Sequence, residues 1–362
     1  MAPSTFEDWQ IRTSCCRDDI IDATSTKQRG GNPLRPPQNS EPQLSNRKPA
    51  VSRNETAGSL AENYRKETQI ARLVAFILVC ASFYFRNSFQ MCIDILWEHL
   101  RLQPYFCSAY FESVYVTVVY GLIIVLYPYA MHYISYLSRF KVKDDVTYVH
   151  QTVLGILKDA VVYLAPLFFA DSIIQKKYSG VPVDEWAIRS KQWIQTTRAL
   201  PVESPNFLTM CFHVFGSVIV FDALFFVVHF TLHKNAFLYR HVHALHHRHG
   251  AMHAHVTNQL TVVERGAIVV AANYSLKLFS AHPLTRLVFV VVFLWMLVDN
   301  HTGYDMPWSP HRLAPAGLMG GPAAHHAHHV NGAKHYQPFF TYLDTCLERW
   351  DARKSVGISK GK

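Results

Sequence analysis

Charged side chains are scarce in this sequence. Asp, Glu, Lys and Arg make up 17% of the 362 residues, whereas hydrophobic residues make up 49%. The length allows two soluble domains, which carry about 25% charged residues on average, but this composition favours a membrane protein. The net charge of +9 comes with no zinc-finger spacing and no basic recognition helix, so we expect anionic membrane lipids, and no nucleic acid, as partners.

Cysteine-based sites are also missing. The seven cysteines form no CxxC pair, so the sequence predicts neither a disulfide framework nor a thiolate metal site. It also contains no recognisable flavin, haem or nicotinamide motif. If the protein carries out redox chemistry, side chains other than cysteine must bind its metal ions. Its electrons must then come from a separate donor protein.

Apolar segments organise the chain. The polar, basic residues 1–68 predict a disordered tail, residues 69–206 the first membrane helices and their loops, and residues 351–362 a basic C-terminal tail. The apolar runs are residues 73–85, 114–137, 153–174, 207–232 and 266–298. We therefore predict an all-α polytopic membrane helical bundle. The run 153–174 is interrupted by charges and is either amphipathic or partly inside the protein.

The last apolar run predicts a bent pair of helices. His282-Pro283 splits residues 266–298 into halves of about 16 residues, which are short for membrane spans. A helical hairpin or re-entrant pair bent near Pro283 would return His301 to the side on which residues 229–247 lie. Four crossings from a cytosolic tail, oriented by the positive-inside rule, predict a cytosolic histidine-rich cap. Lys176 and Arg189 with their basic neighbours would then be lumenal, which argues against this orientation, and a run 153–174 that does not fully cross would alter it.

Histidine is the residue that this sequence has in excess. Of its 21 histidines, 16 lie between residues 229 and 329. They form one H-x-x-x-H box and two H-x-x-H-H boxes, and residues three or four apart share a helix face. The box histidines are His229, His233, His243, His246, His247, His325, His328 and His329. Converging imidazoles can hold one or two transition-metal ions.

The alternative to metal binding is an ordinary buried or surface histidine. That interpretation suits histidines outside the boxes: His99, His132, His150 and His213. Histidines between the boxes are expected to lie around the site or on the surface rather than to bind metal: His241, His249, His253 and His255.

The boxes and the segment DNHTGYDMPWSPHRLAP, residues 299–315, resemble the fatty acid hydroxylase and sterol desaturase superfamily. The resemblance covers about residues 207–349 and identifies residues 207–350 as the catalytic domain. It is greatest for the cholesterol 25-hydroxylase branch, which has HSGYNFPWSTHRLVP, and for the C-4 methylsterol oxidase branch. This chain departs from the usual family pattern at His326, His335 and Leu343, where Asp, Asn and Trp are typical.

The resemblance implies a set of site residues. Its metal ligands fall on the eight box histidines, with His301 as the first and His311 as the second choice between the second and third boxes. His326 is a neighbour and not a ligand. Asp222 and Glu264 are candidates to orient ligand imidazoles, and Asp305 either does the same or accepts backbone hydrogen bonds in a turn.

The same resemblance implies the reaction. It predicts two iron ions, O2 as co-substrate, and hydroxylation of a sterol, terpenoid or fatty-acyl chain taken from the bilayer of the endoplasmic reticulum. Helices 114–137 and 207–232 would frame an apolar cleft for that lipid. Cytochrome b5 with its reductase, or a related pair, would supply electrons. A desaturase or multi-step methyl oxidase on the same scaffold is the closest alternative, and a histidine-rich metal transporter is a distant one.

Overall fold

The computed structural model describes residues 53–248 and 251–360, and their side chains over 61–248 and 251–353. In this part of the chain the secondary structure is helical and contains only isolated β-bridges, as expected for an all-α protein. The long helices are α2 (Arg53–Tyr84), α3 (Arg86–Leu100), α5 (Phe111–Tyr133), α6 (Val153–Ile173), α8 (Phe207–Lys234), α11 (Val262–Leu278), α12 (Pro283–His301) and α15 (Tyr342–Lys360). The shorter ones are α4 (Pro104–Cys107), η1 (Ser135–Phe140), α7 (Val183–Arg189), α9 (Ala236–Leu238), η2 (Tyr239–His243), α10 (Ala244–His247), η3 (Ala254–Asn258), α13 (Pro310–Leu313), η4 (Pro315–Gly317) and α14 (Gly321–Asn331).

Five of the described helices are long and apolar enough to cross a bilayer. They are Ala61–Tyr84 within α2, together with α5, α6, α8 and α12. In α6 only Asp171 is buried among its described residues. The apolar face of α6 is therefore not packed inside the protein, which corrects the expectation that this segment lies partly in the interior.

The helix α2 overlaps the N-terminal tail that was predicted to be disordered, and corrects its boundary. It begins at Arg53, so residues 53–68 of the expected disordered segment are helical, while residues 1–52 lie outside the described part. Seven of the eleven residues 57–67 are Ala, Leu, Glu, Arg or Lys, which are good helix formers, and the helix continues directly into the apolar run. At the other end, α15 continues to Lys360, so residues 351–360 of the expected tail are also helical.

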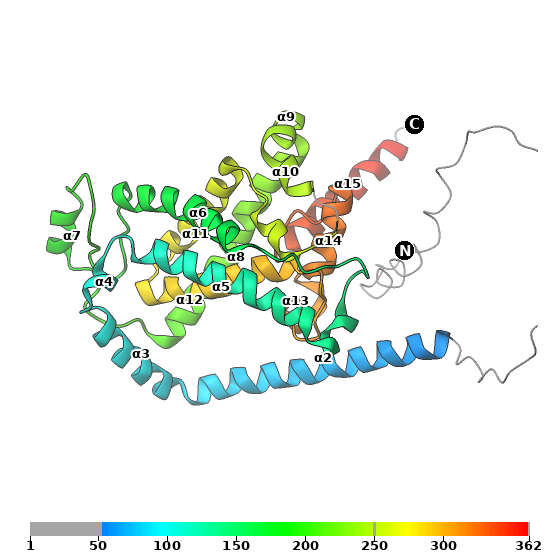
Figure 1. Cartoon of the computed structure of the whole chain (residues 1–362), viewed down its shortest axis with the longest axis horizontal. Helices are drawn as coiled ribbons and strands as arrows, with labels where there is room; N and C mark the ends of the chain where they lie inside the picture. Colours follow the sequence, from blue (N-terminus) through cyan, green and yellow to red (C-terminus); the bar gives the residue numbers. More distant parts are fainter. Residues whose placement is uncertain (1–52, 249–250, 361–362) are drawn as a thin grey trace, which may run out of the picture. The chain divides into compact units, whose positions relative to one another are not determined.

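The central element of the bundle is α12. It packs against α5, α8 and α14, while α11 packs against α8 and α6 against α5 (Figure 1). Phe289 and Phe293 of α12 lie in one core cluster with Phe221 of α8 and Tyr120 of α5, and each fully buried phenylalanine stabilises the fold by about 1.5–3 kcal/mol. The expected apolar cleft between α5 and α8 is therefore filled by side chains of α12.

The helices α11 and α12 make the expected bend. His282 caps α12 by accepting a hydrogen bond from the backbone N–H of Leu284 (3.2 Å), and Pro283 occupies the first turn, where its missing N–H costs nothing. The start of α11 lies beside η2, where the Thr261 hydroxyl donates to the carbonyl of Val242 (2.9 Å). The chain thus leaves the histidine-rich end along α11 and returns to it along α12.

Candidate metal centre

One group of histidines joins four helical elements. His229 and His233 lie one turn apart near the end of α8, His243 and His247 lie at the end of η2 and of α10, and His328 lies on α14. Each offers one ring nitrogen, and these nitrogens all lie within 4.8 Å of one another. The turn η2 is a π-helical turn, a wider turn that is often found at functional sites.

The spacing of the nitrogens in this group is that of ligands around one ion. Nε2 of His243 lies 3.1 Å from Nε2 of His229, and 2.9 Å from Nε2 of both His233 and His247. Two imidazole nitrogens bound at right angles to one metal, each at about 2.1 Å, are about 3.0 Å apart. The five rings therefore leave a position of suitable size for a single metal ion.

A second group lies beside the first. It contains His246, His301, His325 and His329, all buried, with one ring nitrogen of each within 4.8 Å of the others. Nε2 of His325 lies 2.9 Å from Nε2 of His301 and 3.1 Å from Nε2 of His329. His301 belongs to this group because α12 returns to the histidine end, where its Nε2 lies 3.4 Å from Nε2 of His246.

Each H-x-x-H-H box is divided between the two groups. In the second box, His243 and His247 face the first group and His246 faces the second. In the third box, His328 faces the first group, whereas His325 and His329, one helical turn apart, face the second. Adjacent helical residues point in directions about 100° apart, so the two neighbouring histidines of each box face different groups.

Hydrogen bonds at Nδ1 determine the tautomer of several rings. Nδ1–H of His229 donates to the carbonyl of Tyr336 (2.7 Å), and Nδ1–H of His328 donates to the carbonyl of Lys334 (2.7 Å). Nδ1–H of His301 donates to the carbonyl of Leu297 (2.8 Å). A carbonyl can only accept, so the hydrogen is on Nδ1 and the lone pair of Nε2 is available to a metal.

Glu264 orients His243 in the same way. Its Oε1 accepts a hydrogen bond from Nδ1–H of His243 at 2.7 Å, and both side chains are buried. Glu264 lies in the first turn of α11, where the side chain of Thr261 caps the helix. The contact matches the geometry expected for a carboxylate that orients a metal-ligand histidine.

The charge state of the rings suits metal binding. Burial lowers the pKa of His243 to about 2, helped by neighbouring histidines, and burial holds the pKa of His246, His325 and His328 well below the usual range. These rings are neutral at pH 7, as metal ligands must be. Nε2 of His328 is buried and has no hydrogen-bond partner within the described residues, so the donor set fits a metal ion that accepts this lone pair.

His311 lies outside both groups. Its Nε2 donates to Oδ1 of Asp305 (2.8 Å), and Asp305 also accepts hydrogen bonds from Arg312 Nε (2.9 Å) and the Tyr64 hydroxyl (3.0 Å). These partners hold the pKa of Asp305 well below the usual carboxyl range, although its partial burial acts in the opposite direction. His311 lies at the start of α13 and faces Asp305. Asp305 therefore orients His311 and not a histidine of either group.

Asp222 has a different role from the expected one. It accepts hydrogen bonds from the backbone N–H groups of Phe339 (2.8 Å) and Phe340 (3.1 Å), and from the side chain of Gln337. It therefore stabilises the loop that follows α14 and contacts no histidine of either group. That loop carries the Tyr336 carbonyl that orients His229.

Several supporting groups were not predicted from sequence. Asp344 accepts hydrogen bonds from the backbone N–H of Tyr336 and of Gln337, both at 2.9 Å. The backbone carbonyls that orient His229 and His328 are provided by a loop far along the chain from α8. Every residue has a backbone carbonyl, so the sequence cannot show which carbonyls accept hydrogen bonds from His229 and His328. Of these supporting groups, only the carboxylate of Asp344 could have been recognised by its residue type.

Comparison with known proteins shows the family of this chain. Residues 214–348 match the fatty acid hydroxylase family. Cholesterol 25-hydroxylase of Homo sapiens is 30% identical over 266 residues, which are 72% of this chain and 91% of that protein. Cholesterol 25-hydroxylase of Rattus norvegicus is 37% identical over 155 residues, 43% of this chain and 52% of that protein.

Another relative belongs to the other expected branch. The Dictyostelium discoideum protein named "Putative methylsterol monooxygenase" is 33% identical over 162 residues, 43% of this chain and 58% of that protein. No solved structure matches the chain. Similarity over nearly the whole length of the human relative, together with the match over residues 214–348, shows that the chain is an oxidoreductase that belongs to the fatty acid hydroxylase family.

Proposed function

We propose that this protein is an O2-dependent di-iron hydroxylase of a membrane lipid, with a sterol as the first candidate substrate. The observation that carries the proposal is the pair of histidine groups at one end of a bundle of apolar helices. One iron would be held by His229, His233, His243, His247 and His328, and the other by His246, His301, His325 and His329. His311 is left out of this set because its Nε2 is bonded to Asp305.

The chemistry of the donors supports iron and oxygen. When bound, the two irons would supply activation of O2 for attack on a C–H bond. Imidazoles suit iron, and the groups contain no thiolate that activated oxygen would destroy. The protein's own contribution is to keep the rings neutral, to fix their tautomers through Glu264 and backbone carbonyls, and to bury the histidine groups away from bulk water.

The substrate class follows from the membrane and from the relatives. The five apolar helices leave many large hydrophobic side chains exposed, for example Val227 (61%) on α8 and Phe169 (68%) on α6, as in a protein that contacts acyl chains. The human and rat relatives are named for hydroxylation of cholesterol. A sterol, or a terpenoid or fatty-acyl chain of similar solubility, would therefore reach the site from the bilayer.

A second candidate is multi-step methyl oxidation or desaturation on the same scaffold. The Dictyostelium relative is named for a methylsterol reaction, and these reactions share hydrogen abstraction with hydroxylation. A metal transporter is disfavoured, because transport sites lie near the bilayer midplane. Here His229 and His233 lie in the last turns of α8, and His301 ends α12.

The remaining parts of the proposal concern electrons and location. Two electrons are needed per turnover, and the sequence has no flavin, haem or nicotinamide motif, so cytochrome b5 with its reductase, or a related pair, would act as donor. We place the protein in the endoplasmic reticulum membrane with its histidines on the cytosolic side. Protease protection of an epitope inserted near α10, in sealed microsomes, tests this orientation.

The experiment that tests the activity is sterol and lipid profiling of cells with and without the protein. A product heavier by one oxygen supports hydroxylation, and a product lighter by two hydrogens supports desaturation. His246→Ala and His328→Ala each remove a ligand from one group and should abolish the product while the protein remains in the membrane. Unchanged product in either variant would overturn the ligand assignment.

A further inference from the structure

The last turn of α12 carries a histidine of the second group at the point where the helix ends. His301 is the last residue of α12, and the chain turns away at Gly303, which has a φ of 75°. The final carbonyl groups of a helix have no partner within the helix, so its last turn frays unless other contacts hold it. The position of the His301 ring therefore depends on what the neighbouring residues of this turn contact.

Two buried neighbours of His301 bond this turn to other segments. The hydroxyl of Tyr127, on α5, donates to Oδ1 of Asp299 at 2.6 Å. The side chain of Asn300 donates to the backbone carbonyl of Pro338, in the loop that follows α14. Asp299 is 2% exposed and Asn300 is 6% exposed, so water does not readily replace a lost partner of either side chain. The turn that ends in His301 is thus held from two sides.

Tyr127 bonds the side of α12 that faces away from the His301 ring. Asp299 and His301 are two residues apart, so their side chains leave the helix in directions about 200° apart. Helix α5, which carries Tyr127, contains none of the histidines of either group. Any effect of Tyr127 on the second group therefore passes through the turn that carries His301.

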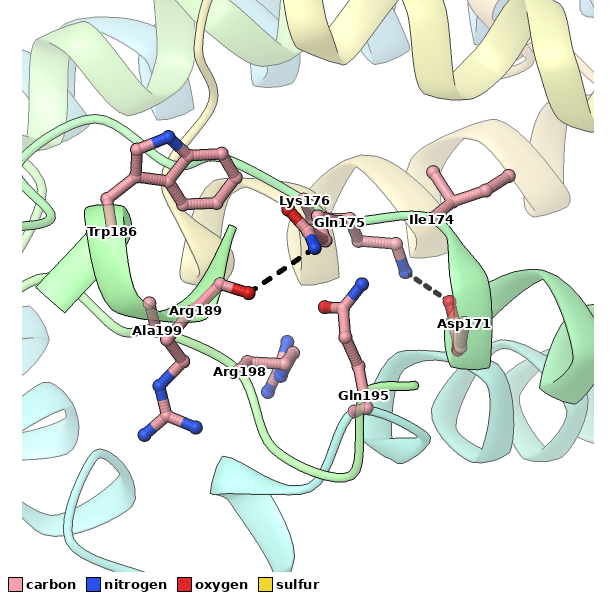
Figure 2. Close-up of a pocket in the computed structure, with 10 residues that line it drawn as sticks. Asp171, Ile174, Gln175, Lys176, Trp186, Arg189, Gln195, Arg198 and Ala199 are labelled. Carbon is pink, nitrogen blue, oxygen red and sulfur yellow. Dashed lines mark hydrogen bonds and ion pairs between the residues drawn. The ribbon is translucent and has the colours of Figure 1, made fainter. Parts of the chain in front are cut away.

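The opposite ends of α5 and α12 are joined by charged side chains. Glu112, in the first turn of α5, pairs with Arg286 of α12 and with Lys176, both at 3.0 Å. Figure 2 shows the ammonium group of Lys176 turned toward Asp171, with which it pairs at 2.8 Å. This network bonds the start of α5 to the start of α12, almost the full length of α12 away from His301.

A second tyrosine of α5 makes a comparable bond near that opposite end. The hydroxyl of Tyr115 donates to the backbone carbonyl of Leu287, on α12, at 3.3 Å. Tyr115 and Tyr127 therefore each join α5 to α12 by one hydroxyl group. Of the two, Tyr127 acts within one helical turn of a predicted metal ligand. The pair can therefore separate a general loss of contact between the helices from an effect on the metal position.

We propose that Tyr127 is a positioning residue for the second metal ion, an inference that rests on the proposed function because it needs an ion at the second histidine group. By holding Asp299, the Tyr127 hydroxyl keeps the last turn of α12 wound. Nε2 of His301 then points toward Nε2 of His325, which lies 2.9 Å away. Without the hydroxyl, Asp299 loses a buried partner and the turn that carries His301 is free to move. The second ion should then bind more weakly, while the first is not affected.

Variants that keep one metal ion test the proposal. His247→Ala leaves the second group intact and His325→Ala leaves the first group intact, so each should bind about one Fe²⁺ ion per chain. Tyr127→Phe is added to each, and Fe²⁺ affinity is measured without oxygen, by competition with a chelator, on the full-length protein in detergent. Tyr127→Phe should weaken Fe²⁺ binding about tenfold in the His247→Ala protein, as expected for the loss of a group that orients a ligand. In the His325→Ala protein it should leave Fe²⁺ binding unchanged.

Further variants separate positioning from stability. Tyr115→Phe removes the other hydroxyl between the same two helices and should leave Fe²⁺ binding unchanged in both proteins. Asp299→Asn keeps an acceptor oxygen for the Tyr127 hydroxyl and should retain most of the affinity of the second group, whereas Asp299→Leu should lose at least as much as Tyr127→Phe. Adding Tyr127→Phe to Asp299→Leu should then cause no further loss, because the two residues act through one bond.

The outcomes distinguish this inference from the proposed function. Unchanged Fe²⁺ binding when Tyr127→Phe is added to His247→Ala would overturn the positioning role. An equal loss caused by Tyr115→Phe, or an equal loss at the first group, would also overturn it, because the effect would then be one of stability alone. If neither His247→Ala nor His325→Ala binds an Fe²⁺ ion, the proposed set of metal ligands fails, and this inference fails with it.

Discussion

Glu264 and His243 form a buried hydrogen bond of 2.7 Å at the centre of the larger histidine group. His243 is the ring whose Nε2 lies within 3.1 Å of the Nε2 atoms of His229, His233 and His247. Any rotation of this one ring would change its distance to three others. The carboxylate of Glu264 therefore determines more of the site geometry than its position outside the histidine boxes suggests.

The first prediction concerns this carboxylate. Glu264→Ala should lower the metal affinity of the first group about 10- to 100-fold, because Nδ1–H of His243 loses its acceptor and the ring is free to turn. Glu264→Gln retains a carbonyl oxygen at the same position and should retain most of the metal. Metal analysis of both purified variants after dialysis against a weak chelator measures the difference, and equal loss in the two variants would contradict the orienting role.

The second prediction separates the two groups. His247→Ala removes a ligand of the first group and His325→Ala removes a ligand of the second, so each variant should bind about one metal ion where the unaltered protein binds about two. His326→Ala changes a box neighbour that belongs to neither group and should leave the metal content at about two. Elemental analysis per chain gives the answer, and a full content of metal in His325→Ala would be incompatible with the second group.

The third prediction distinguishes His311 from the ligands. His311→Ala should leave about two metal ions per chain but lower stability by about 1–3 kcal/mol, because the partly buried Asp305 loses a hydrogen-bond partner. Metal content and thermal unfolding in detergent, measured on the same preparation, test both parts. Loss of one metal ion from this variant would return His311 to the ligand set.

The fourth prediction concerns pH and the protein freed of metal. Burial lowers the pKa of His243 to about 2 and holds the pKa of His325 and His328 well below that of a free imidazole. The folded protein therefore stays unprotonated at these rings, while the unfolded chain takes up protons below about pH 6.5. The free energy of unfolding should fall as the pH drops from 7.5 to 5.5.

A variant tests the origin of this slope. His328→Gln removes one buried imidazole, so the free energy of unfolding should fall less steeply as the pH drops. Below pH 6.5 the slope of the variant should be smaller than that of the unaltered protein by about 1.4 kcal/mol per pH unit. Unfolding of the two metal-free proteins is followed by circular dichroism across the pH range. Identical slopes would mean that this ring is not protonated on unfolding.

Much of the site was predictable because it rests on residue type and spacing. The sequence shows the i and i+4 spacing of His229 and His233 and the repeated H-x-x-H-H pattern. In a helix, residues at these spacings lie on the same face. The same holds for the bend at Pro283, since proline and the capping side chain of His282 mark a helix start. His301 was predicted from this bend and from the family resemblance together.

Other features could not be read from the sequence. Asp222 and Asp305 are both acidic residues near the boxes, yet one bonds the loop after α14 and the other bonds His311 and Arg312. The sequence shows that a carboxylate is present but not which donor the packed helices bring within 3 Å of it. The expected cleft between α5 and α8 was wrong for the same reason, because α12 occupies that space.

The sequence by itself determined that this is a helical membrane protein with histidine chemistry, since low charge, long apolar runs and regularly spaced imidazoles are properties of the chain. Only the tertiary structure decided how the histidines divide into one group of five and one of four. The physical reason is that adjacent histidines of a box point in different directions, and the packing of α8, α12 and α14 determines which rings meet.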